Sequence, residues 1–363
     1  MAFDLNENNV KDYLVSVGLL DYGDVLSVET LGWGVSNTLV KVLTPTRNMV
    51  VKQSLEYLRV KEVWKADRKR IYTERECISL LEQVLEPGSC PEIIYEDRPN
   101  FLFVMSSAPE GSINWKELLM SGEISSEMAE ESGKLLKLFH SLDVKSLGLE
   151  ELFNNLDSFI ELRIDPYHRT VARLHSDVSN IVEMEAERML DTQVTLVHGD
   201  YSPKNLLVFK KKPFLIDFEV AHLGNPIFDL AFMVNHLFLK SIYNVPKRND
   251  FFEAIRRFLQ GYYSIVDLDY RRALPDGNFQ DEAYWNKGSL DGTISETNLI
   301  KQIGCLMLAR IDGKSPVEYI ISNDTKDLVR RLSKYLLLEN YQSISEVINL
   351  FDLEMTRENK LTS

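Results

Sequence analysis

The sequence predicts an α+β fold with two lobes, in which an antiparallel sheet with one main helix is followed by a larger, mostly helical lobe. Short β-rich runs separated by turn residues occur between residues 25 and 105, a pattern typical of antiparallel strands. From residue 106 onward, apolar residues recur mostly at helical spacing. A chain of 363 residues, 44% of them apolar, is long enough to bury two cores. We therefore predict one lobe over residues 1–105 and a second over residues 106–363.

The predicted N-terminal lobe combines strands with a single long helix. Strands are expected where β-branched and other apolar residues lie between Gly, Pro and Asn turns, at 25–31, 38–43, 48–53, 93–95 and 101–105. A helix is expected over about 70–85, because the apolar residues of that stretch share one face. Pro87 and Gly88 follow and should end it.

Helical periodicity dominates the second lobe. It predicts helices at 126–140, 170–190, 227–240, 250–263, 293–310, 326–338 and 343–351. Two short strand pairs are expected between Val194 and Glu219, around a polar loop. Residues 267–286 have no clear period and predict an irregular loop. The sequence contains no internal repeat, which excludes a solenoid.

Composition and charge exclude several classes of protein. With 41 basic and 55 acidic residues the net charge is −14, which opposes binding to nucleic acid or to an anionic membrane surface. Cys77, Cys90 and Cys305 lie far apart and predict neither a disulfide framework nor a zinc site. The N-terminus lacks a signal peptide, and no run of about 18 apolar residues occurs. We therefore expect a soluble, unprocessed cytoplasmic protein with reduced thiols and no nucleic-acid or membrane partner.

A polar loop and a second acidic residue carry the strongest chemical signal. Asp200 directly follows an apolar run, Asn205 comes five residues later, and Asp217 follows the next apolar run. Loop formation alone explains one such residue but not this set. Phosphoryl transfer from ATP needs a carboxylate that accepts the acceptor's proton, and an amide oxygen and a carboxylate that bind Mg²⁺. We therefore assign Asp200 as the general base, Asn205 and Asp217 as Mg²⁺ ligands, and His198 as an orienting hydrogen-bonding residue behind the loop.

The same region resembles a known superfamily. It is similar to the aminoglycoside phosphotransferase and choline kinase superfamily, which shares the protein-kinase fold, over the segments His198–Asn205, Leu215–Glu219 and Gly224–Leu230. The resemblance implies a two-lobed protein-kinase-like fold, with a nucleotide-binding lobe over 1–105 and a catalytic and acceptor-binding lobe over 106–363. It also implies ATP and Mg²⁺ as cofactors and the same base and metal roles. Asp229 would be structural and would brace the loop through hydrogen bonds.

A lysine on the third predicted strand completes the expected set. Lys52 would face the nucleotide and bind the phosphates that are not transferred, with a solvated strand lysine as the alternative. Such a lysine needs a carboxylate to orient it, and the following helix offers Glu74 and Glu76. We choose Glu76, because the apolar face of that helix is buried nearby, although periodicity does not separate the two.

Two further segments of the N-terminal lobe are expected to contact the nucleotide. The glycine-containing loop 32–37 lies between two strands, and its backbone N–H groups at Gly34, Ser36 and Asn37 would cover the phosphates. A tight hairpin is the alternative. The strand that ends at Met105 and Ser106 is the expected hinge between the lobes, where the backbone would meet adenine.

Other segments resemble methylthioribose kinase, namely residues 51–59 and the late helix over 304–311. That family usually carries two adjacent arginines in the helix, whereas this chain has Ala309 before Arg310, and its catalytic loop also differs. We therefore expect a related kinase that acts on another sugar or polyol. Arg310 would reach the acceptor or the transferred phosphate, with a cation at a helix C-terminus as the alternative. Trp285 would line the acceptor site, with core packing as the alternative.

These features predict an ATP-dependent kinase that moves the γ-phosphate to a hydroxyl group of a small molecule: a sugar, polyol, amino alcohol or aminoglycoside. A protein kinase is disfavoured, because only residues 218–228 separate Asp217 from Asp229, too few for an activation segment that docks a peptide. The remaining alternative is a catalytically silent nucleotide-binding pseudokinase or a regulatory protein. The oligomeric state, monomer or homodimer, stays open.

Overall fold

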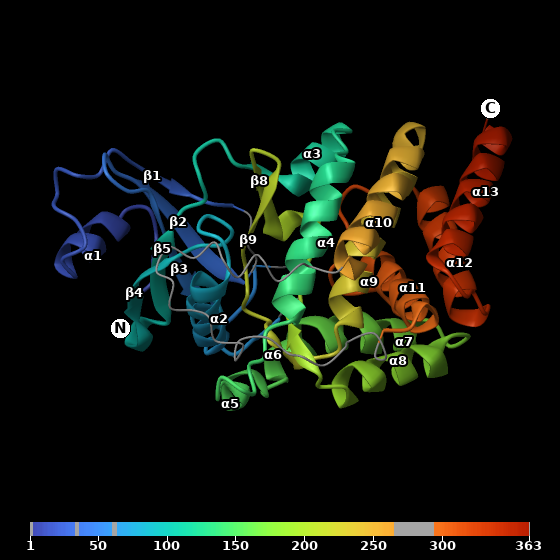
Figure 1. Ribbon diagram of the computed structural model, residues 1–363, viewed down its shortest axis with the longest axis horizontal. Helices are drawn as coiled ribbons and strands as arrows, with labels where there is room; N and C mark the ends of the chain where they lie inside the picture. Colours follow the sequence, from blue (N-terminus) through green and yellow to red (C-terminus); the bar gives the residue numbers. More distant parts are fainter. Residues whose placement is uncertain (1–2, 33–35, 60–63, 265–293, 363) are drawn as a thin grey trace. The chain divides into compact units, whose positions relative to one another are not determined.

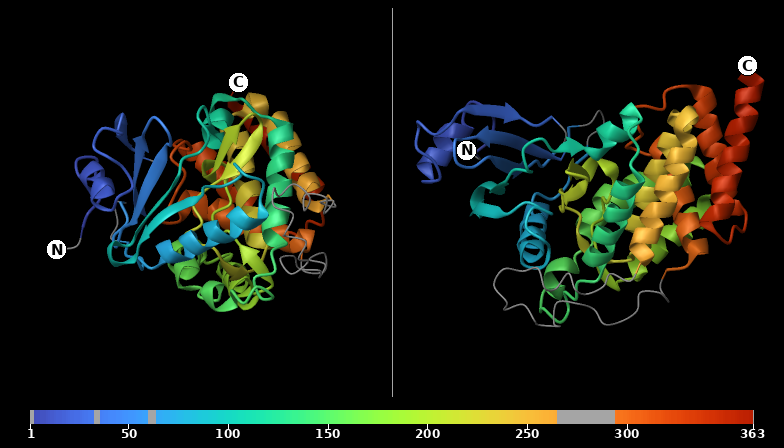
Figure 2. Two further views of the ribbon diagram at one scale, coloured as in Figure 1. Left: turned by 60° about the vertical axis from the view of Figure 1, so that its left-hand side comes forward. Right: turned by 45° about the horizontal axis from the view of Figure 1, so that its top comes forward.

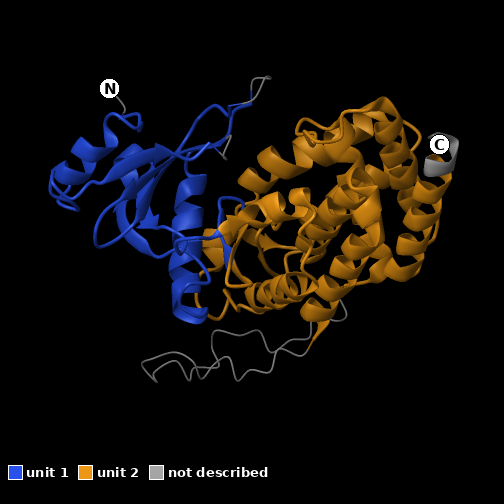
Figure 3. Ribbon diagram, turned by 90° about the horizontal axis from the view of Figure 1, so that it is seen from above, with its two compact units in different colours: residues 1–112, 214–220 blue, residues 113–213, 221–363 orange. Residues whose placement is uncertain are grey.

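The computed structural model describes residues 3–32, 36–59, 64–264 and 294–362. Contacts within the chain divide it into two units (Figure 3). Unit 1 holds residues 1–112 and 214–220, and unit 2 holds residues 113–213 and 221–363. The single boundary expected at residue 105 therefore lies close to the first crossing at Ser112. However, residues 214–220, which include Asp217, also belong to unit 1, so a single boundary cannot describe the division of the chain.

Unit 1 is built on a five-stranded antiparallel sheet in the order β1-β2-β3-β5-β4. Its strands are β1 (Ser27–Thr30), β2 (Asn37–Leu43), β3 (Met49–Ser54), β4 (Ile93–Asp97) and β5 (Leu102–Ser106). All five strand predictions are confirmed, with bounds shifted by one or two residues at most ends. In the centre of the sheet, Lys52 of β3 lies opposite Leu39 and Phe103.

Alternation along β3 sends neighbouring side chains to opposite faces of the sheet. Val51 joins a core with Val10 and Leu14 of helix α1 (Val10–Ser16). Lys52 points to the other face, toward helix α2 (Arg70–Val84), which carries its partner Glu74. Figure 2 shows the ribbon of this helix beside the sheet. The sequence did not predict α1, because its seven residues have no side-chain N-cap and too few turns to establish a period.

Unit 2 is mainly helical, which confirms the predicted α+β class (Figure 1). Its helices are α3 (Trp115–Ser121), α4 (Ser126–His140), α5 (Glu150–Phe153), α6 (Asp157–Phe159), α7 (Thr170–Leu174), α8 (Ser179–Asp191), α9 (Ile227–Tyr243), α10 (Arg248–Tyr263), α11 (Glu296–Asp312), α12 (Asn323–Leu338) and α13 (Ile344–Thr362). The irregular loop expected over 267–286 falls outside the described residues.

The helix expected over 170–190 is broken in the structure. A π-helical segment, Ile160–Arg169, leads into α7, and a turn separates α7 from α8. Pro166 lies inside the π-helical segment, where it has no N–H to donate to a regular helical ladder. The π-helical segment matters for the site, because its buried residues include Arg163 and Tyr167.

Helix α9 runs through the core of unit 2 and packs against α10 and α11 (Figure 1). Every residue from Ile227 to Ile242 is buried, which agrees with the apolar character of this helix around its whole circumference. Core burial therefore accounts for the apolar composition of this helix. None of the helices in the described residues combines the length and apolar composition that crossing a membrane requires.

Helices α4 and α10 approach so closely that glycine is required at the contact. A Cβ atom added to Gly133 would lie 2.0 Å from the carbonyl oxygen of Phe258, and one added to Gly261 would lie 2.1 Å from that of Glu130. Both neighbours are backbone atoms of the facing helix, so neither side can yield by rotating a side chain. The two glycines therefore set the spacing of the helix pair.

We expect Gly133→Ala and Gly261→Ala each to lower the free energy of unfolding by about 1–3 kcal/mol, because overpacking forces the two backbones apart. Alanine's better helix propensity returns only about 0.5–1 kcal/mol. Denaturant unfolding of the whole chain measures the change. Gly23→Ala is the control, since a Cβ there meets no atom within 4 Å. Unchanged unfolding midpoints in both helix variants would contradict this account.

Candidate functional site

The predicted polar loop spans the gap between two small sheets of unit 2. Before the loop, β7 (Thr195–Val197) pairs with β10 (His222–Gly224). After it, β8 (Leu206–Phe209) pairs with β6 (Ile113–Asn114). Strand pairing on both sides fixes the ends of the loop. Gly199 has φ +74° within it, a conformation that suits glycine.

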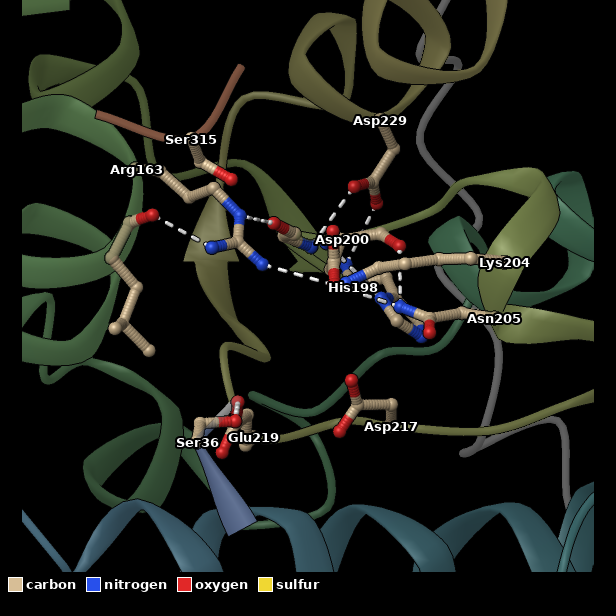
Figure 4. Close-up of polar contacts among 12 residues, drawn as sticks. Ser36, Arg163, His198, Asp200, Lys204, Asn205, Asp217, Glu219, Asp229 and Ser315 are labelled. Atoms are coloured by element: carbon tan, nitrogen blue, oxygen red, sulfur yellow. Dashed lines mark hydrogen bonds and ion pairs between the residues drawn. The ribbon is translucent and has the colours of Figure 1, made fainter. Parts of the chain in front are cut away.

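Asp229, near the start of α9, holds the beginning of this loop (Figure 4). Its Oδ2 accepts the backbone N–H of His198 at 2.7 Å, and its Oδ1 accepts that of Gly199 at 2.9 Å. The His140 ring adds a contact of 3.0 Å to Oδ2. Burial alone would raise the pKa of Asp229, but the hydrogen bond and charge of His140 lower it. The charged carboxylate therefore organises the loop backbone, as the bracing role requires.

Asp200 lies at the centre of a buried polar cluster in unit 2 (Figure 4). Its Oδ2 lies 3.1 Å from Arg163, 2.9 Å from the Lys204 ammonium group and 2.8 Å from the Asn205 amide nitrogen. Its backbone N–H donates to Nδ1 of His198 at 3.2 Å. Three donors on one oxygen favour the ionised carboxylate and fix its orientation. Asp200, Asn205 and His198 are thus brought together, as predicted.

Arg163 is a site residue that sequence reasoning missed. Its Nε donates to the carbonyl oxygen of Gly199 at 2.7 Å, while its terminal nitrogen contacts Asp200. The guanidinium also lies over the rings of Tyr167 and Phe232, at 5.9 and 5.7 Å. No motif marks this arginine, because it comes from the π-helical segment, far from the loop in sequence. Its one signal is a charge between the apolar residues Leu162 and Ile164.

In unit 1, Lys52 lies between two carboxylates. Its ammonium group is 2.6 Å from Glu74 and 2.7 Å from Asp217. Burial alone would lower the pKa of Lys52, but the charges of Asp217, Glu74 and Glu219 raise it above the ordinary value. Burial raises the pKa of Glu74 to about 7, against the opposing charge of Lys52. Lys52 is therefore held as a cation.

The choice of Glu76 as the partner of Lys52 was wrong. Glu76 instead contacts Arg75 at 2.8 Å and Arg98 at 3.1 Å, and its side chain is 28% exposed. The reason is the phase of α2, whose buried face includes Glu74. Two residues further along, Glu76 points roughly 200° away around the helix.

A second carboxylate in the 214–220 segment ties that segment to unit 1. Glu219 accepts the hydroxyl of Ser36 at 2.5 Å, the amide of Asn37 at 2.8 Å and the guanidinium of Arg70 at 2.9 Å. The side chains of Ser36 and Asn37 thus hold Glu219, and the predicted phosphate contacts of their backbone stay a prediction. Gly34, the third residue of that predicted set, lies outside the described residues.

The remaining predicted residues are placed as follows. Met105 is buried in β5, and Ser106 exchanges hydrogen bonds with the backbone of Glu92 at 2.8 and 2.9 Å. Their contact with adenine stays a prediction. Arg310, in α11, donates to the hydroxyl of Tyr167 at 3.1 Å. Trp285 lies outside the described residues.

The donor chemistry suits a metal ion that is shared with phosphates. Among the described residues, no group of three or more His, Cys, Asp or Glu side chains could hold a metal. Mg²⁺ is commonly bound by one or two carboxylates together with substrate phosphates and water. In unit 2, Asn205 uses its amide nitrogen on Asp200, so its carbonyl oxygen is the atom it offers a cation. In unit 1, Asp217 offers a carboxylate.

Sequence comparison identifies relatives over most of both units. The phosphotransferase enzyme family matches residues 27–265, more than half of the chain. Methylthioribose kinase 2 of Oryza sativa subsp. japonica is 24% identical over 244 residues, which cover 60% of this chain and 57% of the rice protein. Methylthioribose kinase 1 of the same plant is 25% identical over 248 residues, with 60% and 56% covered. The chain thus spans a little over half the length of these relatives.

Two solved structures resemble most of the chain in fold. Spectinomycin phosphotransferase APH(9)-Ia, in complex with ADP and spectinomycin, matches with a TM-score of 0.52 and 13% identity over 96% of this chain and 94% of that one. Amicoumacin kinase hAmiN, in complex with AMP-PNP, Ca²⁺ and Ami, matches with a TM-score of 0.50 and 14% identity over 92% and 95%. At these identities the likeness speaks for the fold, and it confirms the predicted kinase-like architecture.

Proposed function

This chain belongs to the phosphotransferase enzyme family, and from that premise we propose that it transfers the γ-phosphoryl group of ATP to a hydroxyl group of a small molecule. The observation that carries the proposal is the buried Asp200 carboxylate, which Arg163, Lys204 and Asn205 hold in unit 2. A carboxylate fixed before the acceptor arrives suits a general base, because no part of the reaction's free energy is then needed to orient it.

In this proposal, Asp200 accepts the proton of the acceptor hydroxyl. Arg163 and Lys204 stabilise the charged carboxylate until then, and the amide of Asn205 orients it. Asp229 acts indirectly, because it fixes the backbone of the loop that carries Asp200. When bound, ATP supplies the phosphoryl group and Mg²⁺ neutralises charge on the phosphates.

Lys52 is the proposed contact to the phosphates that are not transferred. Glu74 and Asp217 orient its ammonium group and keep it charged. Asp217 and Asn205 are the proposed Mg²⁺ ligands, because each offers a hard oxygen atom of the kind that Mg²⁺ prefers. The proposed lesser contacts are those of the loop and the strand end, namely Gly34, Ser36, Asn37, Met105 and Ser106.

The proposed acceptor is a sugar or a related polyol, with amino alcohols and aminoglycosides as the other candidates. The rice relatives are methylthioribose kinases, which supports a sugar. In unit 2, Arg163 contacts Asp200 and packs on Tyr167, which in turn bonds Arg310. This contact chain supports a place for Arg310 near the acceptor. Trp285 stays a proposed member of the acceptor site on the sequence argument alone.

The test is release of ADP from ATP and Mg²⁺ with a panel of sugars, sugar acids, polyols, amino alcohols and aminoglycosides, with Asp200→Asn as the blank. Turnover that depends on one acceptor class and disappears in the variant supports the proposal. If the chain binds Mg·ATP and phosphorylates no member of the panel, the silent nucleotide-binding protein becomes the better description.

The two neighbouring glutamates of α2 provide a matched pair of variants. Glu74→Gln removes a buried charge at 2.6 Å from Lys52, and we expect kcat/KM for ATP to fall by about 10–100-fold. Glu76→Gln breaks contacts on a partly exposed surface and should change kcat/KM by less than about twofold. Steady-state ADP release measures both. Equal losses in the two variants would argue against Glu74 as the orienting residue.

A further inference from the structure

Lys240, a buried lysine of α9, lies on the same helix face as Phe232, which packs against Arg163 beside the proposed base Asp200. Phe228, Phe232, His236 and Lys240 follow one another at intervals of four, so they share one face. The ring of Phe232 packs on Phe228 at 5.5 Å and on His236 at 5.2 Å. Lys240 extends this row by one more turn.

Lys240 is 1% exposed, yet no described carboxylate forms an ion pair with it. Its ammonium group reaches the carbonyl oxygen of His236 at 3.5 Å and lies 5.3 Å from the centre of the Tyr319 ring. A buried cation without a counter-ion is costly. Burial, together with the charges of Lys116 and Arg310, lowers the pKa of Lys240 to about 7, and the charge of Glu318 opposes this shift.

Two polar groups near Lys240 lack a hydrogen-bond partner among the described residues, and a third group forms only an exposed ion pair. Within the described chain, Nε of Arg310 and the hydroxyl of Tyr319 are buried without a hydrogen-bond partner. Lys116 pairs with Glu318 at 2.5 Å, but the Glu318 side chain is 65% exposed. Exposed pairs of this kind contribute little stability, so another anion can replace Glu318 at low cost.

We call Lys240, Arg310 and Lys116 the cationic cluster. Inside unit 2 it is linked to Asp200 through Tyr167, which Arg310 contacts. Arg163 contacts Asp200 and lies over both Tyr167 and Phe232. Burial alone would raise the pKa of Tyr167, but the charges of Arg310 and Arg163 lower it. The cluster therefore begins beside the proposed base and extends along α9 to Lys240.

We propose that the acceptor carries an anionic group, a carboxylate or a phosphate, and that Lys240, Arg310 and Lys116 bind it. This inference rests on the proposed function and narrows its substrate class from sugars and polyols to their acidic derivatives. The anion supplies the missing counter-charge to Lys240, satisfies Nε of Arg310 or the Tyr319 hydroxyl, and takes the place of Glu318 beside Lys116. A cationic acceptor such as an aminoglycoside would meet repulsion here.

The test measures binding of matched pairs of compounds to the whole chain by calorimetry, with Mg·ADP present so that the nucleotide phosphates are already in place. D-gluconate against D-glucitol tests a carboxylate, and glycerol 3-phosphate against glycerol tests a phosphate. We expect the anionic member of at least one pair to bind at least about tenfold more tightly, the effect of one buried charge-assisted hydrogen bond. Which pair shows the preference identifies the anion.

Lys240→Met, which keeps the length of the side chain without its charge, should abolish this preference. Lys247→Met is the matched control, because Lys247 is 51% exposed and pairs with Asp250, and it should leave the preference intact. If Lys240→Met fails to fold, Lys116→Gln decides, with an expected weakening of the anionic member by about threefold or more.

Equal affinities within both pairs, or a preference that survives in the deciding variant, would overturn the inference. ADP release separates this result from the fate of the proposed function. Anion-selective binding without turnover of any acceptor would refute the proposed function and leave the anion site standing. Turnover of neutral acceptors without anion preference would support the proposed function and refute the anion site.

Discussion

Asp200→Asn is expected to lower kcat for acceptor phosphorylation by about 10²–10⁴-fold, the usual contribution of a general base. Asparagine has the same shape as aspartate and cannot accept the proton. The affinity for Mg·ATP should stay within a few fold, because the Lys52, Glu74 and Asp217 contacts are untouched. Single-turnover measurements of product formation, with binding of a fluorescent ATP analogue alongside, separate the two effects.

The variant also removes the charge that Arg163 and Lys204 contact, so folding needs its own check. Thermal unfolding of Asp200→Asn should remain cooperative. Asp250→Asn is a suitable control, because its carboxylate is exposed and pairs only weakly with Lys247 at 3.5 Å. Turnover above about a tenth of the unmodified rate in a folded Asp200→Asn protein would exclude Asp200 as the base.

Much of unit 1 was predictable from local pattern. Strand β5 is an apolar run that ends at Ser106, and β3 begins with the apolar residues Met49, Val50 and Val51, so local composition predicts both. The π-helical segment was not predictable in this way, because Pro166 and the mixed polarity around it match neither the helical nor the strand period. The segment also packs against α11, which no local sequence window contains.

The residues of the candidate site also fall into those that local sequence predicts and those that it does not. Asp200, Asn205 and His198 lie in one loop, so the sequence alone brought them together, and the hydrogen bonds among them agree. The partner of Lys52 depended on the rotational phase of α2, which shows in the burial of Glu74. Glu74 lies three residues after buried Ile71 and four before buried Ile78, so the apolar spacing of α2 already marked its face, and the choice of Glu76 overlooked this signal.

Arg163 shows a second kind of limit. It reaches Asp200 from a segment whose residues are adjacent to the loop in space and distant from it in the chain. The return of residues 214–220 to unit 1 is of the same kind, since it depends on ion pairs such as Arg70 with Glu219. Long-range pairings of single charged residues leave no periodic trace in the sequence.

Asp217→Asn is expected to lower kcat/KM for ATP by about 10²–10³-fold and to raise the Mg²⁺ concentration needed for half-maximal rate. Asp217 has φ +72°, in the left-handed region that asparagine tolerates well. The substitution therefore keeps the backbone and removes only charge. Initial rates measured over a range of Mg²⁺ at saturating acceptor give both quantities, with Asp191→Asn, an exposed carboxylate at the end of α8, as the control.

The Mg²⁺ dependence decides between two roles for Asp217, because this residue is both a proposed metal ligand and a counter-ion 2.7 Å from Lys52. Lys52→Met also removes that ion pair and leaves the Asp217 carboxylate in place. If Asp217 binds the metal, Asp217→Asn shifts the Mg²⁺ curve and Lys52→Met lowers the rate without a comparable shift. If Asp217 only orients Lys52, the two variants lose a similar rate and neither moves the curve. An unchanged Mg²⁺ requirement in Asp217→Asn would therefore reassign this carboxylate from the metal to the lysine.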